Sequence, residues 1–153
     1  MNDKIILLLK YVTIYSMSIL YIIIGIKHFI SPEYFVSIMP PLIPLKEELV
    51  FISGLFEIIL GACLLSNRTR KFGALGIILL LIAVFPVNIY LYLSEIPRDI
   101  LQITKQQALI RMPFQIPLII LSYWHSIERS TKIFSITCII LYIPTILYFI
   151  SIG

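Results

Sequence analysis

The sequence predicts an all-α, polytopic membrane protein that forms a single transmembrane domain over residues 1–153. Hydrophobic residues make up 59% of the chain and charged residues only 13%, whereas a typical soluble domain is about 25% charged. The apolar residues also form long runs, close to the ~20 residues with which a helix crosses a bilayer. We therefore expect an antiparallel four-helix transmembrane bundle, a short interfacial helix after the first span and an extra C-terminal transmembrane helix.

The first span is longer than the apolar region of a signal peptide and no A-x-A site follows it, so we expect it to be retained. Pro113 and Pro117 are expected to shorten or kink the helix of the fourth span, or else Pro113 marks its start. Pro86 and Pro144 are tolerable inside spans where neighbouring groups bind the freed carbonyls. The predicted spans are residues 5–26, 49–66, 72–93, 107–126 and 133–152.

The segment after the first span, "SPEYFVSIMPPLIP", predicts a short helix. Ser31 is a favoured N-cap residue, and Pro32 suits the first helical position. Glu33 suits the positive end of the helix dipole. Because the segment is apolar and aromatic, we expect it to lie in the membrane interface, and "PPLIP" to end it.

Basic residues predict the orientation, because cytoplasmic loops carry more Lys and Arg. The short loop "NRTRK" is the clearest cytoplasmic marker. We expect an N-terminus inside a bacterial cytoplasmic membrane, with Tyr123 and Trp124 in an aromatic belt. The inner set is Lys4, Lys10, Arg68, Arg70, Lys71, Arg129 and Lys132, and the outer set is Lys27, Lys46, Arg98, Lys105 and Arg111.

Polar side chains of four helices are expected at similar depths. An α-helix rises 1.5 Å per residue, so the polar side chains of spans two to four lie about 6–12 Å below the outer membrane surface. A histidine lies at the outer end of the first span. The other half of the bundle is expected to be almost purely apolar. The candidate pocket residues are His28, Glu57, Asn88, Arg111 and Gln115.

Glu57 lies inside the apolar segment "SGLFEIILGACLL". A lone charge at such depth costs about 2.5–3.5 kcal/mol, so Glu57 is expected to face the bundle interior and to have a partner. The small residues Ser53, Gly54 and Gly61 on its face let another helix approach closely. Arg111 is the expected partner, because its planar fork matches a carboxylate.

Structural interpretations stay open for each candidate. The Glu57–Arg111 pair is either a device that sets helix register or part of a binding site, and Glu57 is alternatively protonated and hydrogen-bonded. Arg111 is alternatively an anchor that extends to the interface, and His28 an exposed residue at a helix end. Asn88 and Gln115 are also explained as hydrogen-bonding residues between helices.

Several classes of site are not expected. The two histidines, His28 and His125, lie at opposite ends of their spans, which disfavours a metal site. Cys63 and Cys138 are far apart and read as small buried apolar residues rather than a thiol couple. The basic residues form no face outside the bilayer, so nucleic acid is not an expected partner.

Four blocks in order resemble the DoxX-like family of small membrane proteins: "GIKHFISPEYFVSIMPPLIP", "SGLFEIILGACLL", "NRTRKFGALGIILLLIAVFPVNIYL" and "IRMPFQIPLIILSYW". The resemblance implies a four-helix membrane core over about residues 21–126, with the last span as an addition. Relatives in that family include a membrane subunit linked to thiosulfate:quinone oxidoreduction, and an assembly chaperone for neurotransmitter receptors is a more distant look-alike. This chain lacks the paired cysteines of the thiol-redox branch, so that chemistry is not implied. The pattern residues are Gly25, His28, Phe29, Ser53, Gly54, Glu57, Phe85, Pro86, Asn88, Arg111, Pro113 and Gln115.

The lipid bilayer is an expected partner of any such membrane protein. Beyond this, the sequence suggests two hypotheses for function. The chain is an accessory or binding module, not an enzyme on its own, whose polar pocket holds a lipid, a quinone-like ligand or a partner helix. The alternative is the membrane subunit of a quinone-linked oxidoreductase. Quinone is the candidate ligand in this alternative. Because the sequence shows no cofactor motif, electrons would have to come from a separate redox subunit. A complete transporter is disfavoured because five short spans carry no inverted repeat.

Overall fold

The computed structural model describes residues 2–152, and side chains for residues 2–149. Over this part the chain is all-helical, as predicted, and contains no strand. Two short helices, which follow the first and third long helices, complete the set. The helices are α1 (Asp3–Ile30), α2 (Pro32–Ser37), α3 (Lys46–Leu65), α4 (Arg70–Leu93), α5 (Glu95–Leu101), α6 (Lys105–Ser126) and α7 (Lys132–Ile152).

Four helices, α1, α3, α4 and α7, are long and apolar enough to cross a membrane. The predicted span 107–126 forms a helix, α6, but α6 is not among these four. Its polar residues explain the difference, because Arg111, Gln115 and His125 lie within the predicted span. Large apolar side chains such as Leu8, Leu79 and Leu147 are exposed on the outside of the long helices. Such outward apolar faces are typical of helices surrounded by lipid.

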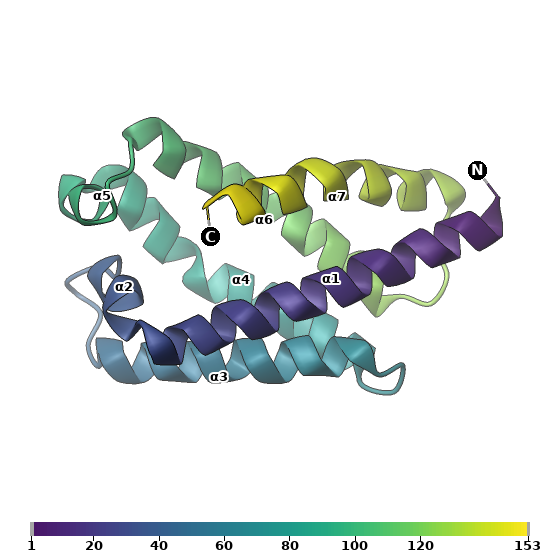
Figure 1. The fold of residues 1–153 in the computed structure, drawn as a ribbon, viewed down its shortest axis with the longest axis horizontal. Coiled ribbons are helices and arrows are strands. Elements are labelled where there is room, and N and C mark those ends of the chain that lie inside the picture. The colour runs from purple at the N-terminus through teal and green to yellow at the C-terminus, as the bar shows by residue number, and fades with distance from the viewer. Residues whose placement is uncertain (1, 153) are drawn as a thin grey trace.

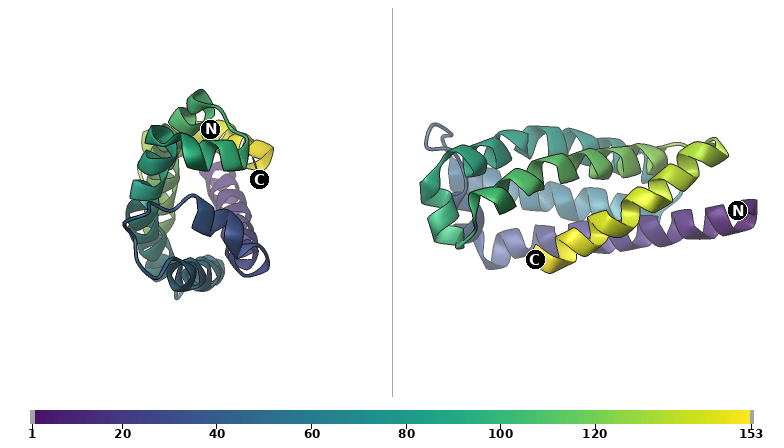
Figure 2. Two further views of the ribbon diagram at one scale, coloured as in Figure 1. Left: turned by 90° about the vertical axis from the view of Figure 1, so that its left-hand side faces the viewer. Right: turned by 90° about the horizontal axis from the view of Figure 1, so that it is seen from above.

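The five long helices run up and down beside one another, with α2 and α5 together at one end (Figure 1). Around the bundle, α1 packs on α3, α3 on α4, α4 on α6, α6 on α7, and α7 returns to α1. Figure 2 shows α7 crossing obliquely between α6 and α1, with its C-terminal end over the C-terminal half of α1. Helix α7 therefore closes the side of the bundle between α1 and α6.

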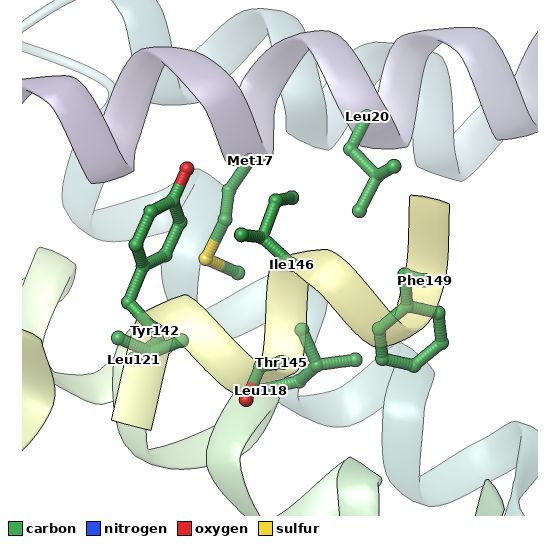
Figure 3. Close-up of a pocket in the computed structure, with 8 residues that line it drawn as sticks. All are labelled: Met17, Leu20, Leu118, Leu121, Tyr142, Thr145, Ile146 and Phe149. Atoms are coloured by element: carbon green, nitrogen blue, oxygen red, sulfur yellow. The ribbon is translucent and has the colours of Figure 1, made fainter. Parts of the chain in front are cut away.

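The contact of α7 with α1 and α6 is apolar and filled by side chains (Figure 3). Met17 of α1 and Leu121 of α6 meet Ile146 of α7 there, and no space for a water molecule remains. Polar links also join α7 to α1: the Tyr142 hydroxyl donates to Ser16 Oγ at 2.6 Å, and Lys132 Nζ lies 3.0 Å from Asp3 Oδ1. The C-terminal helix is thus packed onto the bundle and does not stand apart from it.

The two short helices differ in how well the sequence predicts them. Helix α2 begins at Pro32, as predicted, although the Ser31 side chain makes no capping hydrogen bond. Helix α5 was not predicted, because its seven residues include a proline and read as a loop. Its buried Arg98 donates through Nη1 to the carbonyl oxygens of Leu91 and Tyr92, at 3.3 and 2.5 Å. Arg98 thereby binds carbonyls at the C-terminal end of α4, which have no partner inside that helix.

The main core lies in the half of the bundle away from α2 and α5. It joins Ile14 and Met17 of α1 to Ile77 of α4 and to Leu121 and Trp124 of α6. Trp124 is 0% exposed, so its expected place in an aromatic belt is wrong, whereas Tyr123 is exposed. The indole points inward because its Nε1 donates to Ser130 Oγ at 3.2 Å and its ring fills the core.

Candidate functional site

Helices α1 and α3 cross where two glycines remove the side chains between their backbones. A Cβ atom added at Gly25 would lie 2.6 Å from the Gly54 oxygen, and one at Gly54 would lie 2.5 Å from the Cβ of His28. Farther along the contact, Ser18 Oγ donates to the Gly61 oxygen at 2.7 Å. The prediction that small residues beside Glu57 admit a second helix is confirmed, and that helix is α1.

This close approach brings His28 against Glu57. His28 Nδ1 lies 3.2 Å from Glu57 Oε2, and the two side chains are only 8% and 12% exposed. The same Nδ1 lies 2.9 Å from the Ile24 oxygen. A carbonyl can only accept, so Nδ1 carries a proton and donates it to Ile24. The approach to Glu57 is therefore a close polar contact and not a second well-aligned hydrogen bond.

Two buried oxygens between α1 and α3 keep unused hydrogen-bonding capacity. In the part of the chain with described side chains, Glu57 Oε2 and the Tyr21 hydroxyl make no hydrogen bond. The ring of Phe35 from α2 stacks on His28, with centroids 3.6 Å apart and planes at 19°. The outer side of the histidine is therefore covered by the short helix that follows α1. A buried acid, imidazole and phenol with spare capacity can bind or pass a proton.

The structure does not pair Glu57 with Arg111. Among the described residues the side-chain contact of Glu57 is with His28, while Arg111 acts electrostatically on the Tyr148 hydroxyl of α7. The reason is the helix order, because α3 packs on α1 and α4 whereas α6 packs on α4 and α7. Residues at similar depth therefore lie on different walls. Asn88 on α4 is half-buried and makes no hydrogen bond within the described residues.

A groove of about 380 Å³ lies between α4 and α6 and contains the fifth candidate, Gln115. Gln115 is only 6% exposed, and its amide makes no hydrogen bond among the residues whose side chains are described. A volume of this size lies within the range of small-ligand sites. The residues that line the groove are Leu81, Ile82, Phe85, Met112, Pro113, Gln115, Ile116 and Ile119.

The expectation that the other half of the bundle is almost purely apolar is wrong. Thr13 Oγ1 lies 3.0 Å from His125 Nε2, and both residues are buried. The Thr13 proton goes to the Lys10 oxygen at 2.8 Å, so His125 Nε2 must donate to Thr13. His125 Nδ1 is then an acceptor, and it makes no hydrogen bond in the described part of the chain.

Sequence reasoning missed this link between α1 and α6. A usable signal was present, because Thr13 and His125 both lie in the predicted inner half of their spans, where a polar side chain needs a partner. Lys10 extends the polar region by donating to the Ile127 oxygen at 2.7 Å and by lying 5.4 Å from the centre of the Trp124 ring. The described residues include no group of three potential metal ligands, in this half or elsewhere.

Comparison with known proteins identifies a family for this chain but no individual relative. No curated protein and no solved structure matches the chain. One family model matches residues 17–126, from the middle of α1 to the end of α6, and α7 lies beyond the matched residues. This model describes a domain of unknown function and not a DoxX-like protein, so the resemblance to the DoxX-like family is wrong. The chain belongs to the family of the domain of unknown function DUF8561.

Proposed function

We propose that this protein is a multi-pass membrane protein that acts as a binding or accessory module for a lipid or a quinone-like ligand. In this proposal α6 crosses the bilayer together with the four apolar helices, because its buried amide and His125 face inward. The membrane is a bacterial cytoplasmic membrane, and the N-terminus lies inside. The excess of basic residues near the N-terminus and in the α3–α4 loop supports that orientation.

The groove between α4 and α6 is the observation that carries the proposal. The Gln115 amide makes no hydrogen bond with the described side chains, so a bound polar group would pair with it. Apolar side chains surround Gln115 in the groove, as in sites that bind apolar ligands and orient them with few polar groups. Ile82 and Ile116 are 57% and 59% exposed, so a ligand chain can continue from the groove into the surrounding lipid.

The experiment is to purify the full chain in a mild detergent and identify the bound lipids by mass spectrometry. A lipid or quinone should be enriched over the total membrane extract and should be lost from Gln115→Leu. Gln106→Leu is the matched control, because Gln106 is an exposed glutamine on the same helix. The proposal fails if no molecule is enriched, or if both variants keep the same lipids as the original chain.

The contact between His28 and Glu57 supports a second candidate, the membrane subunit of a quinone-linked oxidoreductase. Tyr21 lies farther along the contact between α1 and α3, beside Gly61, so three proton-carrying groups are buried between these two helices. Such groups can relay protons to a quinone within a membrane, while a partner subunit supplies electrons. Enrichment of a quinone that is lost from Glu57→Gln would favour this candidate. Co-purification of one membrane protein would instead favour an accessory role.

A further inference from the structure

The end of the bundle opposite α2 and α5 gathers positive charge from separate parts of the chain. The N-terminal part of α1, the α3–α4 loop and the α6–α7 loop lie together there (Figure 1). Two of its cations, Lys10 of α1 and Arg70 of α4, are partly buried and lie close enough to act on one another electrostatically. Both also act on the buried His125 of α6, so both lie near this residue. Two positive charges held this close to each other are stabilised by an anion beside them.

Contacts with the protein hold both cations in place and leave several of their donors unused. Lys10 Nζ donates to the Ile127 oxygen at 2.7 Å. Arg70 Nε donates to the Leu64 oxygen at 2.9 Å, and the guanidinium carbon lies 5.2 Å from the centre of the Tyr11 ring. Within the described residues, the other ammonium protons of Lys10 and the Nη1 and Nη2 donors of Arg70 make no hydrogen bond. These donors can bind phosphate oxygens.

Among the described residues, no carboxylate forms an ion pair with either cation. The acidic residues in the chain segments at this end are Asp3 and Glu128. Asp3 pairs with Lys132, at 3.0 Å between Oδ1 and Nζ, and Glu128 is exposed. The ammonium of a zwitterionic head group would meet only like charge beside the two cations. The cluster therefore selects a head group with a net negative charge.

We infer that Lys10 and Arg70 bind the phosphate of an anionic phospholipid such as phosphatidylglycerol, in the leaflet on the side of the N-terminus. A lipid is favoured over a free anion because an exposed row leads along α1 away from the cations. Tyr11, Tyr15 and Ile19 follow one another at i, i+4 spacing, and the last two are 46% and 55% exposed. The acyl chains lie along this row. Basic pockets between membrane helices bind anionic head groups in this way.

This site goes beyond the proposed function, because none of its residues lines the groove between α4 and α6. The experiment compares dioleoyl phosphatidylglycerol with dioleoyl phosphatidylethanolamine, by native mass spectrometry of the purified full chain. Phosphatidylglycerol should bind about tenfold more tightly, because two cations attract its net charge. Lys10→Gln and Arg70→Gln should each lower this preference about fivefold. Lys10→Arg and Arg70→Lys keep the charge and should retain it.

Lys4→Gln and Arg129→Gln are the matched controls, because both residues are exposed at the same end and carry the same charge. They should leave the preference unchanged, as should Gln115→Leu. Equal binding of the two lipids by the original chain would overturn the inference, and so would equal losses in the control and site variants. Displacement of the lipid by inorganic phosphate would show a site for a free anion and would also overturn it. Each of these failures leaves the proposed function standing, because that function is tested by Gln115→Leu.

Discussion

His28 Nδ1 lies 3.2 Å from Glu57 Oε2, at the point where Gly25 and Gly54 let α1 and α3 touch. The contact explains how an acid is accommodated inside an apolar helix, because a basic partner and a second helix shield it from the surroundings. It also links the short helix α2 to the bundle, since Phe35 stacks on the same histidine. The His28–Glu57 pair is therefore the first contact to test by mutation.

His28 and Glu57 should be coupled in stability, whereas Arg111 and Glu57 should not. In a double-mutant cycle with alanine, the free energies of unfolding for His28 and Glu57 should depart from additivity by about 1 kcal/mol. The Arg111–Glu57 cycle should be additive within about 0.5 kcal/mol. Unfolding in mixed micelles, followed by circular dichroism, measures both cycles. A larger coupling for Arg111 than for His28 would contradict the contact described.

Gly54→Ala should destabilise the protein by about 1–3 kcal/mol, because the added methyl overlaps His28 and the backbone of Gly25. The control is Gly76→Ala, where the methyl meets only the flexible side chain of Leu60. That variant should be milder, since alanine also favours the helix. Thermal unfolding in detergent compares the two. Equal losses would mean that α1 and α3 are not in close contact at Gly54.

Thr13→Val should destabilise the protein by about 1–3 kcal/mol, because the buried Nε2–H of His125 loses its acceptor. Thr137→Val is the matched control. Thr137 is exposed, and its hydroxyl bonds only within its own helix, to the Ile133 oxygen. Its replacement should change stability by less than about 0.5 kcal/mol. A neutral Thr13→Val would show that the α1–α6 hydrogen bond contributes nothing.

Arg98→Met should destabilise the protein by about 1.5–3 kcal/mol. Methionine keeps much of the apolar stem and removes the donors that bind the carbonyls of Leu91 and Tyr92. Arg129→Met, at an exposed arginine, tests loss of a positive charge alone. Hydrogen exchange at the C-terminal turn of α4 should rise in the first variant and not in the second. No change there would contradict the capping role of Arg98.

Orientation in the membrane is tested by labelling single cysteines in a chain carrying Cys63→Ala and Cys138→Ala. Leu42→Cys, at a position 94% exposed next to α2, should react with a membrane-impermeant thiol reagent added outside intact cells. Asn67→Cys, in the α3–α4 loop, should react only after the membrane is opened. The reverse pattern would place the N-terminus outside.

Signals in the sequence were enough to predict the long helices and their apolar character. Lengths of apolar runs predicted five long helices, and Ser31 with Pro32 marked the start of α2, because these signals act within a few residues of the chain. The small residues around Glu57 likewise predicted a close helix partner. Helix α5 escaped prediction because its fold depends on Arg98 reaching back to α4.

The identity of neighbouring helices, and therefore of the polar groups that meet, depends on how the helices pack in three dimensions. Equal depth placed Glu57 and Arg111 together in the prediction, but depth says nothing of position around a bundle, and the chain order of packing put His28 beside Glu57 instead. The contact of Thr13 with His125 joins residues 112 positions apart. Local sequence cannot encode such pairs, because each is selected by the packing of whole helix faces against one another.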